Sequence, residues 1–433
     1  MQYYSTNSQS QRVSFREATI QGQAPDKGLY FPEYIPKLKE GFIQNINRYS
    51  REEVALEVIR PYVADTIPKE DLERIVRETI DFEIPLVQVN EKISCLELFH
   101  GPTLAFKDVG ARFMSRCLGY FVRGFNKKVT VLVATSGDTG GAVANGFFNV
   151  EGVDVIILYP SGKVSNVQEL QLTTLGGNVT ALEVNGTFDD CQRMVKSAFA
   201  DENITKHLFL TSANSINVAR WLPQQFYYFF AYQQWEDKLQ PPVISVPSGN
   251  FGNICAGLLA YSSGLPAAKF IAACNANDVV PNFFRTGKYK AQETVHTISN
   301  AMDVGDPSNF IRILQLFGHN IPELQKVLES YTITDEETKR VMKKVSDDFE
   351  YTLDPHGAVA YLCLHRYLEQ HTGVKGYFLG TAHPIKFFDV VEDVLHEKIE
   401  LPEAIQDLVK KKKQSIKIQA DNKALKDYLL NSH

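Results

Sequence analysis

The sequence predicts an α/β fold with mostly parallel sheets that are covered by helices on both faces. Seven apolar runs rich in β-branched residues have the length and composition of buried strands, and helical patterns separate most of them. Three of the runs lead into polar or glycine-rich segments, as ligand-binding strand ends do in such sheets. The expected strands are residues 129–134, 153–159, 179–184, 208–211, 243–246, 270–274 and 377–380.

The remaining elements divide the chain into three expected ranges. Charged helical stretches at 51–60 and 69–80 precede the strands, so residues 1–95 are expected to form a cap lobe. Residues 96–240 and 241–433 are expected to form two α/β domains. The aromatic stretch 225–232 has no interleaved Lys or Arg, which favours a buried helix between domains over a nucleic-acid stacking surface. Residues 335–351 read as a charged amphipathic helix.

Lys107 is the first candidate for chemistry. It lies in the mostly apolar segment 100–108 (HGPTLAFKD), after a turn. Apolar surroundings penalise an ammonium, so the pKa of Lys107 should fall and leave a free amine that condenses with aldehydes. Pyridoxal phosphate requires this property of its lysine. The alternative is a solvated helix start with a charge pair between Lys107 and Asp108.

Two loops of similar design follow two of the strands. Segment 135–144 (TSGDTGGAVA) follows the strand at 129–134, and segment 247–253 (PSGNFGN) precedes a helix expected at 254–261. Backbone N–H groups at such turns bind anions, aided by the helix dipole. Neither loop has a P-loop ending or a dinucleotide fingerprint, so nucleotide binding is the weaker interpretation. Ordinary βα turns remain an alternative for each loop.

A third strand end, at 377–380, runs into segment 381–387 (TAHPIKF). A hydroxyl at Thr381 can bond a heterocyclic nitrogen at this edge of an α/β sheet. For His383 the alternative is a capping or packing histidine, because no partner follows from the sequence. His356, which follows the amphipathic helix, is likewise expected to be structural.

These segments together resemble the threonine synthase family, whose members are pyridoxal-phosphate enzymes of fold type II. The resemblance extends along most of the chain and includes segments 13–18 (VSFREA), 28–32 (GLYFP) and 100–108. It implies a cofactor bound between two α/β domains, with Lys107 as the Schiff-base lysine and Thr381 facing the pyridine nitrogen. It also implies a phosphate cup for the cofactor, made of Ser248, Gly249, Asn250, Phe251, Gly252 and Asn253.

The same resemblance implies a substrate site. Asp138, near the phenolic oxygen of the cofactor, stands where many relatives of this fold carry asparagine. The substrate carboxylate is expected at Thr135, Ser136, Gly137 and Thr139. Segment 159–165 (YPSGKVS) is similar to a family segment in which an arginine is common at Ser161. Candidates for the substrate phosphate and polar rim are Lys163, Ser165, Arg112, Asn214 and Arg220.

The implied substrate is O-phospho-L-homoserine, and the implied products are threonine and phosphate. In this reaction Lys107 would remove the α-proton, a second deprotonation at Cβ would expel phosphate from Cγ, and water would add at Cβ. Two alternatives stay open. One is another fold type II lyase or dehydratase acting on a hydroxy- or phospho-amino acid, and the other is a catalytically inert phosphometabolite-binding homologue.

Composition limits the other possibilities. The 433 residues are 44% hydrophobic and carry a net charge of −6, which gives no general attraction to nucleic acid. The one basic run, 410–413, reads as a solvated helix end. Six scattered cysteines lack metal-ligand spacing, so no metal site is expected. With no leader-like start and no apolar run of membrane-spanning length, we expect a cytoplasmic monomer or homodimer.

Overall fold

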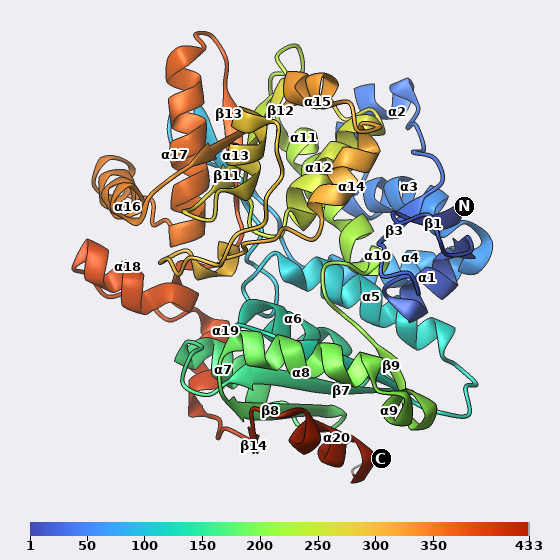
Figure 1. The fold of residues 1–433 in the computed structure, drawn as a ribbon. Helices are drawn as coiled ribbons and strands as arrows, with labels where there is room; N and C mark the ends of the chain where they lie inside the picture. Colours follow the sequence, from blue (N-terminus) through green and yellow to red (C-terminus); the bar gives the residue numbers. More distant parts are fainter. Residues whose placement is uncertain (432–433) are drawn as a thin grey trace.

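The computed structural model describes residues 1–431, and three sheets organise them (Figure 1). An antiparallel sheet in the N-terminal lobe contains β1 (Gln2–Ser5), β2 (Val13–Ser14) and β3 (Tyr30–Pro32). The six-stranded sheet, in the order β12-β11-β10-β13-β5-β4, contains β4 (Leu86–Gln88), β5 (Ile93–Glu97), β10 (Val243–Pro247), β11 (Lys269–Cys274), β12 (Leu328–Thr332) and β13 (Gly376–Gly380). The five-stranded sheet, in the order β14-β8-β7-β6-β9, contains β6 (Val129–Ala134), β7 (Val153–Pro160), β8 (Val179–Asn185), β9 (Phe209–Thr211) and β14 (Ile416–Gln419).

The expectation of mostly parallel sheets is confirmed, as are all seven expected strands. Neighbouring strands in the two large sheets are parallel except for β4 and β5. Every residue of β6 is buried, as expected for a strand that is covered on both faces. Because β6 pairs with β7 from Val129↔Val153 to Ala134↔Leu158, the loops that follow these strands leave the same edge of the sheet.

The expected helices are also present. The N-terminal lobe contains α1 (Phe15–Gln21), α2 (Glu40–Gln44), α3 (Arg51–Val63) and α4 (Lys69–Thr79), and the amphipathic helix is α16 (Asp335–Phe349). The aromatic helix α11 (Gln225–Gln234) is buried from Gln225 to Tyr232 and packs against both α3 and α12 (Gly252–Ser262). Its expected burial is therefore confirmed.

The chain crosses between the two large sheets three times. After β5 it passes through α5 (Lys107–Phe121), which lies between the two halves in Figure 1, to reach β6. It returns through α10 (Val218–Trp221) and α11 to β10. After β13 it passes η5 (Pro384–Phe387), α18 (Phe388–Leu395), α19 (Glu403–Gln406) and η6 (Leu408–Lys410), and then adds β14 to the five-stranded sheet.

Each large sheet is thus built from separate parts of the chain. The strands β4 and β5 lie within or at the end of the expected cap lobe 1–95, yet they pair in the six-stranded sheet. Strand β14 lies in the expected range 241–433, yet it belongs to the five-stranded sheet. We infer that the two sheets, rather than consecutive ranges of residues, delimit the two α/β domains.

One apolar core runs through the N-terminal lobe, α5 and both large sheets. It joins Phe15 of the lobe, Phe113 of α5, Val131 of β6 and Ile244 of β10, all of which are fully buried. Burial of a large aromatic side chain contributes roughly 1.5–3 kcal/mol. The core therefore holds the two sheets and α5 in one arrangement.

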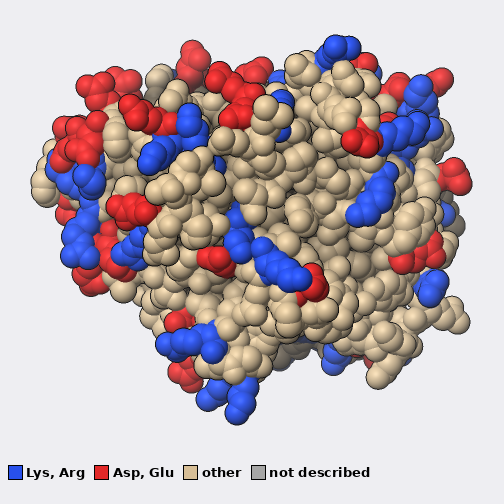
Figure 2. Space-filling view, turned by 90° about the horizontal axis from the view of Figure 1, so that it is seen from above, with Lys and Arg blue, Asp and Glu red and all other residues tan. Residues whose placement is uncertain are grey.

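The surface carries both charges. On the face in Figure 2, basic side chains are scattered among acidic ones, with acidic side chains gathered along the upper left edge. No helix among residues 1–431 is both long and apolar enough to cross a membrane.

The basic run at 410–413 is exposed and starts at the end of a short helix, as expected for a solvated helix end, but one of its lysines is paired. The short helix η6 stops at Lys410, and the Nζ atom of Lys413 lies 2.5 Å from a carboxylate oxygen of Glu169 and 2.8 Å from one of Glu183. Lys413 therefore connects the C-terminal segment to α7 (Asn166–Thr173) and to β8. The sequence pattern gave no sign of these two acidic partners, which are over 200 residues away.

Candidate active site

The segment before Lys107 is closed into a turn by the residue after it. Backbone N–H of Thr103 donates to the Asp108 carboxylate over 2.9 Å, and the Thr103 hydroxyl donates to the other oxygen of that carboxylate. Leu104 has φ +56°, a left-handed conformation that is uncommon for a residue with a side chain. The strained turn and the buried carboxylate fix where α5, and with it Lys107, begins.

The same segment lies against the carboxyl end of β13. The N–H of Phe106 donates to the carbonyl of Thr381 over 2.9 Å, and the N–H of His383 donates to the carbonyl of Leu104 over 3.1 Å. The hydroxyl of Tyr227 donates to the carbonyl of Phe106. These contacts bring Lys107 and Thr381 together although they are far apart in the sequence.

Lys107 is enclosed. Its Nζ atom lies 3.5 Å from a carboxylate oxygen of Asp138 and 4.8 Å from the centre of the Phe106 ring, and its side chain is 17% exposed. Burial lowers its pKa; Asp138 opposes this effect, and the charges of Lys386 and Arg220 add to it. The expected fall in the pKa of Lys107 is confirmed, and the amine is suited to nucleophilic attack and proton transfer.

Asp138, the first residue of α6 (Asp138–Phe147), receives three donors. Nζ of Lys386 lies 2.8 Å from Oδ1, Nε2 of Gln168 donates to the same oxygen over 2.9 Å, and Lys107 faces Oδ2. Burial by itself raises the pKa of Asp138, but the two ammonium groups and the hydrogen bonds outweigh it and the pKa is lowered. The carboxylate is therefore an anion.

The loop between β6 and α6 is preorganised. The Thr135 hydroxyl accepts from the N–H groups of Gly137 and Gly140, each over 2.9 Å. Gly137 has φ +138°, and a Cβ there would lie 2.5 Å from the Gln168 side chain, so this position requires glycine. Ser136 is exposed and Thr139 is half-buried at the start of α6, which leaves an accessible site with helix N–H groups for an anion.

The loop between β10 and α12 has the shape of a cup. The hydroxyl of Ser248 donates to the carbonyl of Val246 over 2.8 Å, and a Cβ at Gly249 would lie 2.6 Å from the Cα of Met302. Phe251 precedes α12 with φ +58°, and Gly252 is the first residue of the helix. Hence the loop turns tightly, and the first N–H groups of α12 face the cup.

Two asparagines of this loop differ in their hydrogen bonds. Nδ2 of Asn250 donates to the hydroxyl of Ser215 over 2.7 Å, and its Oδ1 accepts from the N–H of Ser308 over 2.7 Å. Oδ1 of Asn253 accepts from the hydroxyl of Tyr228 over 2.8 Å, whereas its Nδ2 is buried without a hydrogen-bond partner among the described residues. A buried donor without an acceptor is unusual and favours a ligand oxygen at this position.

The five residues expected around the substrate phosphate and polar rim differ in their burial and in their contacts. Arg220 is buried, and burial lowers its pKa to about 10; its guanidinium donates to the carbonyl of Ala213, and its Nε has no partner among the described residues. Lys163 is exposed, and the hydroxyl of Ser165 caps α7. Asn214 is half-buried in the segment before α10.

Arg112 does not join the group around Lys107. Its guanidinium donates to the carbonyl of Glu78 over 3.0 Å and 2.6 Å, and it lies 2.5 Å from a carboxylate oxygen of Asp81. Both partners belong to the N-terminal lobe, next to the end of α4. These contacts give Arg112 a structural role between α4 and α5.

Sequence reasoning missed Lys386 and Gln168. Lys386 stands within the segment 381–387, but a lysine after a strand end gives no sign of full burial. Gln168 occupies the third position of α7, where the capping box with Ser165 predicts a role only at the helix start. Both residues are identified by their contact with Asp138.

The two histidines have structural contacts. His383 caps η5, since its Nδ1 accepts from the N–H of Ile385 over 3.1 Å, and burial lowers its pKa to about 4. Nδ1 of His356 lies 2.6 Å from an oxygen of Asp354, while its Nε2 accepts from the N–H of Ala301. The structural interpretation of His356 agrees with these contacts.

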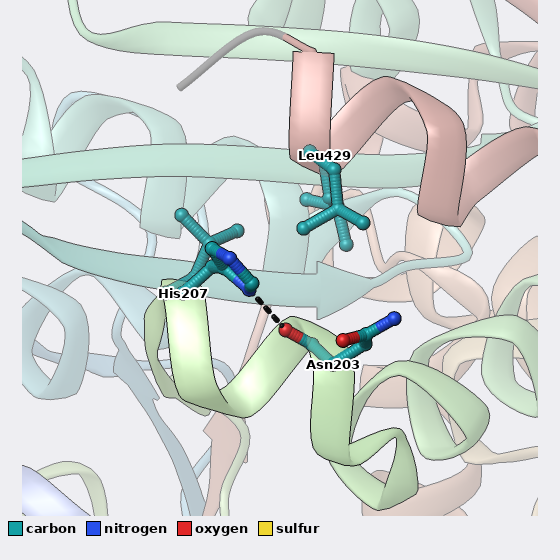
Figure 3. A pocket seen from close by; sticks show the side chains of 5 residues that line it. Asn203, His207 and Leu429 are labelled. Atoms are coloured by element: carbon teal, nitrogen blue, oxygen red, sulfur yellow. Dashed lines mark hydrogen bonds between the residues drawn. The ribbon is translucent and has the colours of Figure 1, made fainter.

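A hollow of about 260 Å³ lies elsewhere, between α9 (Glu202–His207) and α20 (Asn422–Asn431). In Figure 3 the ring of His207 faces Leu429, and its Nδ1–H donates to the carbonyl of Asn203 over 2.7 Å. None of its lining residues belongs to the group around Lys107, and the hollow has no part in the site.

Comparison with known families covers nearly the whole chain. The family described as "Pyridoxal-phosphate dependent enzyme" matches residues 83–376. "Threonine synthase N terminus" matches residues 2–80, and "Threonine synthase, C-terminal" matches residues 357–429.

Individual relatives and solved structures are similar along their full lengths. Threonine synthase of Escherichia coli K12 is 42% identical, with 100% of both chains covered, and that of Saccharomyces cerevisiae is 36% identical, covering 95% of this chain and 94% of its own. The crystal structure of the Escherichia coli enzyme has a TM-score of 0.93 at 43% identity, with both chains fully covered. A structure of threonine synthase from Brucella melitensis with bound PLP also has a TM-score of 0.93, at 34% identity, covering 100% of this chain and 99% of its own.

Proposed function

This chain belongs to the threonine synthase family of pyridoxal-phosphate-dependent enzymes, and we propose that it forms L-threonine and phosphate from O-phospho-L-homoserine and water at Lys107. The enzyme is then a carbon–oxygen lyase that acts on a phosphate ester, in threonine biosynthesis. One observation carries the assignment of the residue. Lys107 is a largely buried lysine with a lowered pKa, which faces Asp138 at the start of α6 and follows Phe106, whose N–H donates to the carbonyl of Thr381.

The residues present fit pyridoxal phosphate. The buried Nδ2 of Asn253 lacks an acceptor, and the start of α12 offers N–H groups to a phosphate. We assign the phosphate to the loop Ser248–Asn253, the ring nitrogen to the hydroxyl of Thr381, and the aldehyde carbon to Lys107. When bound, the cofactor supplies an electron sink for the carbon that carries the substrate's amino group.

Lys107 is the group that moves protons. Its lowered pKa increases the share of free amine, so it can accept a proton and return it. The turn closed by Asp108 fixes the start of its helix, while the long side chain can reach neighbouring carbons of the substrate in turn. We therefore assign the transfers at Cα, Cβ and Cγ to this one residue.

The substrate's two anionic groups are assigned to different places. The carboxylate is assigned to the start of α6, at Thr135, Ser136, Gly137 and Thr139, where N–H groups and exposed hydroxyls are available. The phosphate is assigned to Arg220 with Lys163, Ser165 and Asn214. Arg220 supports this assignment because its buried guanidinium has no carboxylate bonded to it among residues 1–431 and retains an unpaired Nε. Arg112 is left out because its partners are in the N-terminal lobe.

The decisive experiment follows both products together. Purified protein receives O-phospho-L-homoserine with pyridoxal phosphate, and free phosphate and threonine are measured over time, with Lys107→Ala as the control. We expect equal amounts of the two products from the native chain and loss of both in the variant. Phosphate accompanied by 2-oxobutyrate and ammonia would make the protein a different lyase of the same fold, and no turnover would favour an inert binding protein.

The oligomeric state and the cellular location of the protein are further parts of the proposal. We assign the protein to the cytoplasm because all six cysteines are free and buried, a state that a reducing compartment maintains. We assign it as a monomer or a homodimer, which light scattering on the purified protein measures directly.

A further inference from the structure

Lys386 is a lysine without access to water. Its side chain is 0% exposed; Nζ lies 2.8 Å from Oδ1 of Asp138 and donates over 2.8 Å to the carbonyl of Thr103. A buried ammonium is strongly destabilising unless it is paired and hydrogen-bonded, so these contacts are what allow Lys386 to carry its charge.

Lys386 and Lys107 share one carboxylate. The closer contact, and the additional hydrogen bond from Gln168, are both on Oδ1, which faces Lys386, whereas Lys107 lies 3.5 Å from Oδ2. One carboxylate compensates about one buried ammonium. Since Lys386 has the shorter contact and a further carbonyl acceptor, it is the closer cationic partner of Asp138.

We propose that Lys386 is a positioning residue that occupies the Asp138 carboxylate and thereby leaves Lys107 as a free amine. The inference rests on the proposed function only in taking Lys107 as the reactive lysine. On this proposal the pull of Asp138 on the Lys107 proton is weakened, because the carboxylate is shared with Lys386. Whatever Lys107 is bonded to, Asp138 retains a cationic partner, so a buried unpaired carboxylate never forms.

The other charged groups nearby do not replace Lys386. Arg220 contributes to the low pKa of Lys107, but it has no contact with Asp138. Asp108 is occupied by Thr103, and burial raises the pKa of Asp108 despite that contact. His383, whose pKa burial lowers to about 4, is neutral near pH 7.

A purely structural role makes a different prediction. Lys386 also holds the carbonyl of Thr103, which Gln171 contacts as well, over 3.1 Å. If Lys386 only fixed this turn, its removal would change stability and cofactor retention but would not alter the pH at which Lys107 loses its proton.

The test measures the proton affinity of Lys107 in the full-length chain without cofactor. Trace acetylation is carried out from neutral to alkaline pH, and the modified Lys107 peptide is quantified by mass spectrometry against the exposed Lys163 as an internal standard. Lys107 is reachable, being 17% exposed, whereas Lys386 is not. The midpoint is the pH at which labelling of Lys107 is half of its maximum. In Lys386→Met we expect this midpoint to rise by about one pH unit or more, which lowers labelling of Lys107 near neutral pH roughly tenfold.

Matched variants separate charge from packing. Lys386→Arg keeps the charge and should restore the native midpoint. Asp138→Asn should lower the midpoint below that of the native chain, and adding Lys386→Met to Asp138→Asn should raise it again. Circular dichroism shows whether each variant folds. If Lys386→Met alone does not fold, the comparison of Asp138→Asn with and without Lys386→Met provides the test.

The proposal is overturned if folded Lys386→Met labels Lys107 with the native midpoint, or if Asp138→Asn with and without Lys386→Met gives equal midpoints. Neither result would affect the product assay, in which failure of Lys107→Ala to abolish threonine formation would count against the proposed function instead.

Discussion

At the scale of single residues, the cofactor cup depends on one amide group. Asn253 is held by the hydroxyl of Tyr228 through its oxygen, and its Nδ2 is buried without an acceptor among the described residues. A buried unpaired donor destabilises a protein by about 1–3 kcal/mol, a penalty that a bound phosphate oxygen removes. Asn253 therefore favours the loaded protein over the free one.

This predicts a specific loss of affinity. Asn253→Ala should weaken the binding of pyridoxal phosphate roughly tenfold or more, since hydrogen bonds to charged groups contribute about 1.5–3 kcal/mol. The measurement is an absorbance or fluorescence titration of the cofactor-free chain. Tyr228→Phe is the matched control, because it removes the contact to the oxygen but keeps Nδ2; similar losses in both variants would contradict the assignment.

Arg112, in α5, and Arg220, in α10, should behave differently. Arg220→Lys is expected to raise KM for O-phospho-L-homoserine about tenfold with a smaller effect on kcat, because an ammonium cannot reproduce the fork of a guanidinium. Arg112→Lys should leave KM unchanged while lowering the unfolding temperature, since its partners are Glu78 and Asp81. Steady-state kinetics and thermal unfolding of both variants check this, and a raised KM in Arg112→Lys alone would reverse the two roles.

Some of these roles could be predicted from the sequence and others could not. Lys107 follows from its apolar neighbours, which cause the desolvation that lowers its pKa. Lys386 does not, because burial of a lysine depends on a carboxylate nearly 250 residues away. The contacts of Arg112 could not be predicted either, since it lies more than one helical turn beyond Lys107 along α5 and bonds to the N-terminal lobe.

At the scale of elements, the turn from β10 into α12 leaves no room for a side chain. A Cβ at Gly249 would lie 2.6 Å from the Cα of Met302, a backbone atom that cannot rotate away. We expect Gly249→Ala to displace the loop and to reduce cofactor binding by at least tenfold, because N–H groups that hold a phosphate must keep their geometry.

The control for this variant is Gly41→Ala, where a Cβ would meet no atom within 4 Å. Cofactor titration of both variants is the measurement. Native affinity in Gly249→Ala would show that the loop adapts and that the tight turn is not needed for binding.

Element prediction succeeded where strands are buried on both faces. The long apolar run of β6 was identified, whereas β12 and β14 were not, since their residues are mostly half-exposed or exposed and carry polar side chains. The strands β1 to β5 were also missed; they are two to five residues long, and β5 pairs with the distant β13. Such strands form because an adjacent strand is available for pairing, and the composition of the segment itself does not predict that pairing.

At the scale of the whole molecule, Lys413 connects the C-terminal segment to the domain that contains the five-stranded sheet. It pairs with Glu169 and Glu183. Burial by itself would raise the pKa of Glu183, but Lys413, Ser161 and Ser415 outweigh it and lower the pKa to about 2. Because the folded pKa lies below the unfolded one, this pairing stabilises the fold above pH 4.5 or so and is lost as the pH falls toward 2.

Lys413→Met should therefore be less stable than the native chain at pH 7, by about 1 kcal/mol for a partly exposed cation. The difference should shrink as the pH is lowered from about 4.5 toward 2. Urea unfolding of both chains at several pH values measures it. Lys410→Met is the control, since Lys410 pairs with the exposed Asp407. A loss of stability in Lys413→Met that does not change with pH would contradict the role of Glu183.

The interleaving of the two large sheets has a consequence for synthesis on the ribosome. The strands β4 and β5 emerge early but find β13 only after some 280 further residues, and the five-stranded sheet lacks its edge strand until β14 emerges. The six-stranded sheet can therefore be completed only late in synthesis, and the five-stranded sheet later still. Since contacts so distant in sequence form slowly, exposed strand edges persist in the nascent protein, which makes chaperone protection most valuable before the last strand is released.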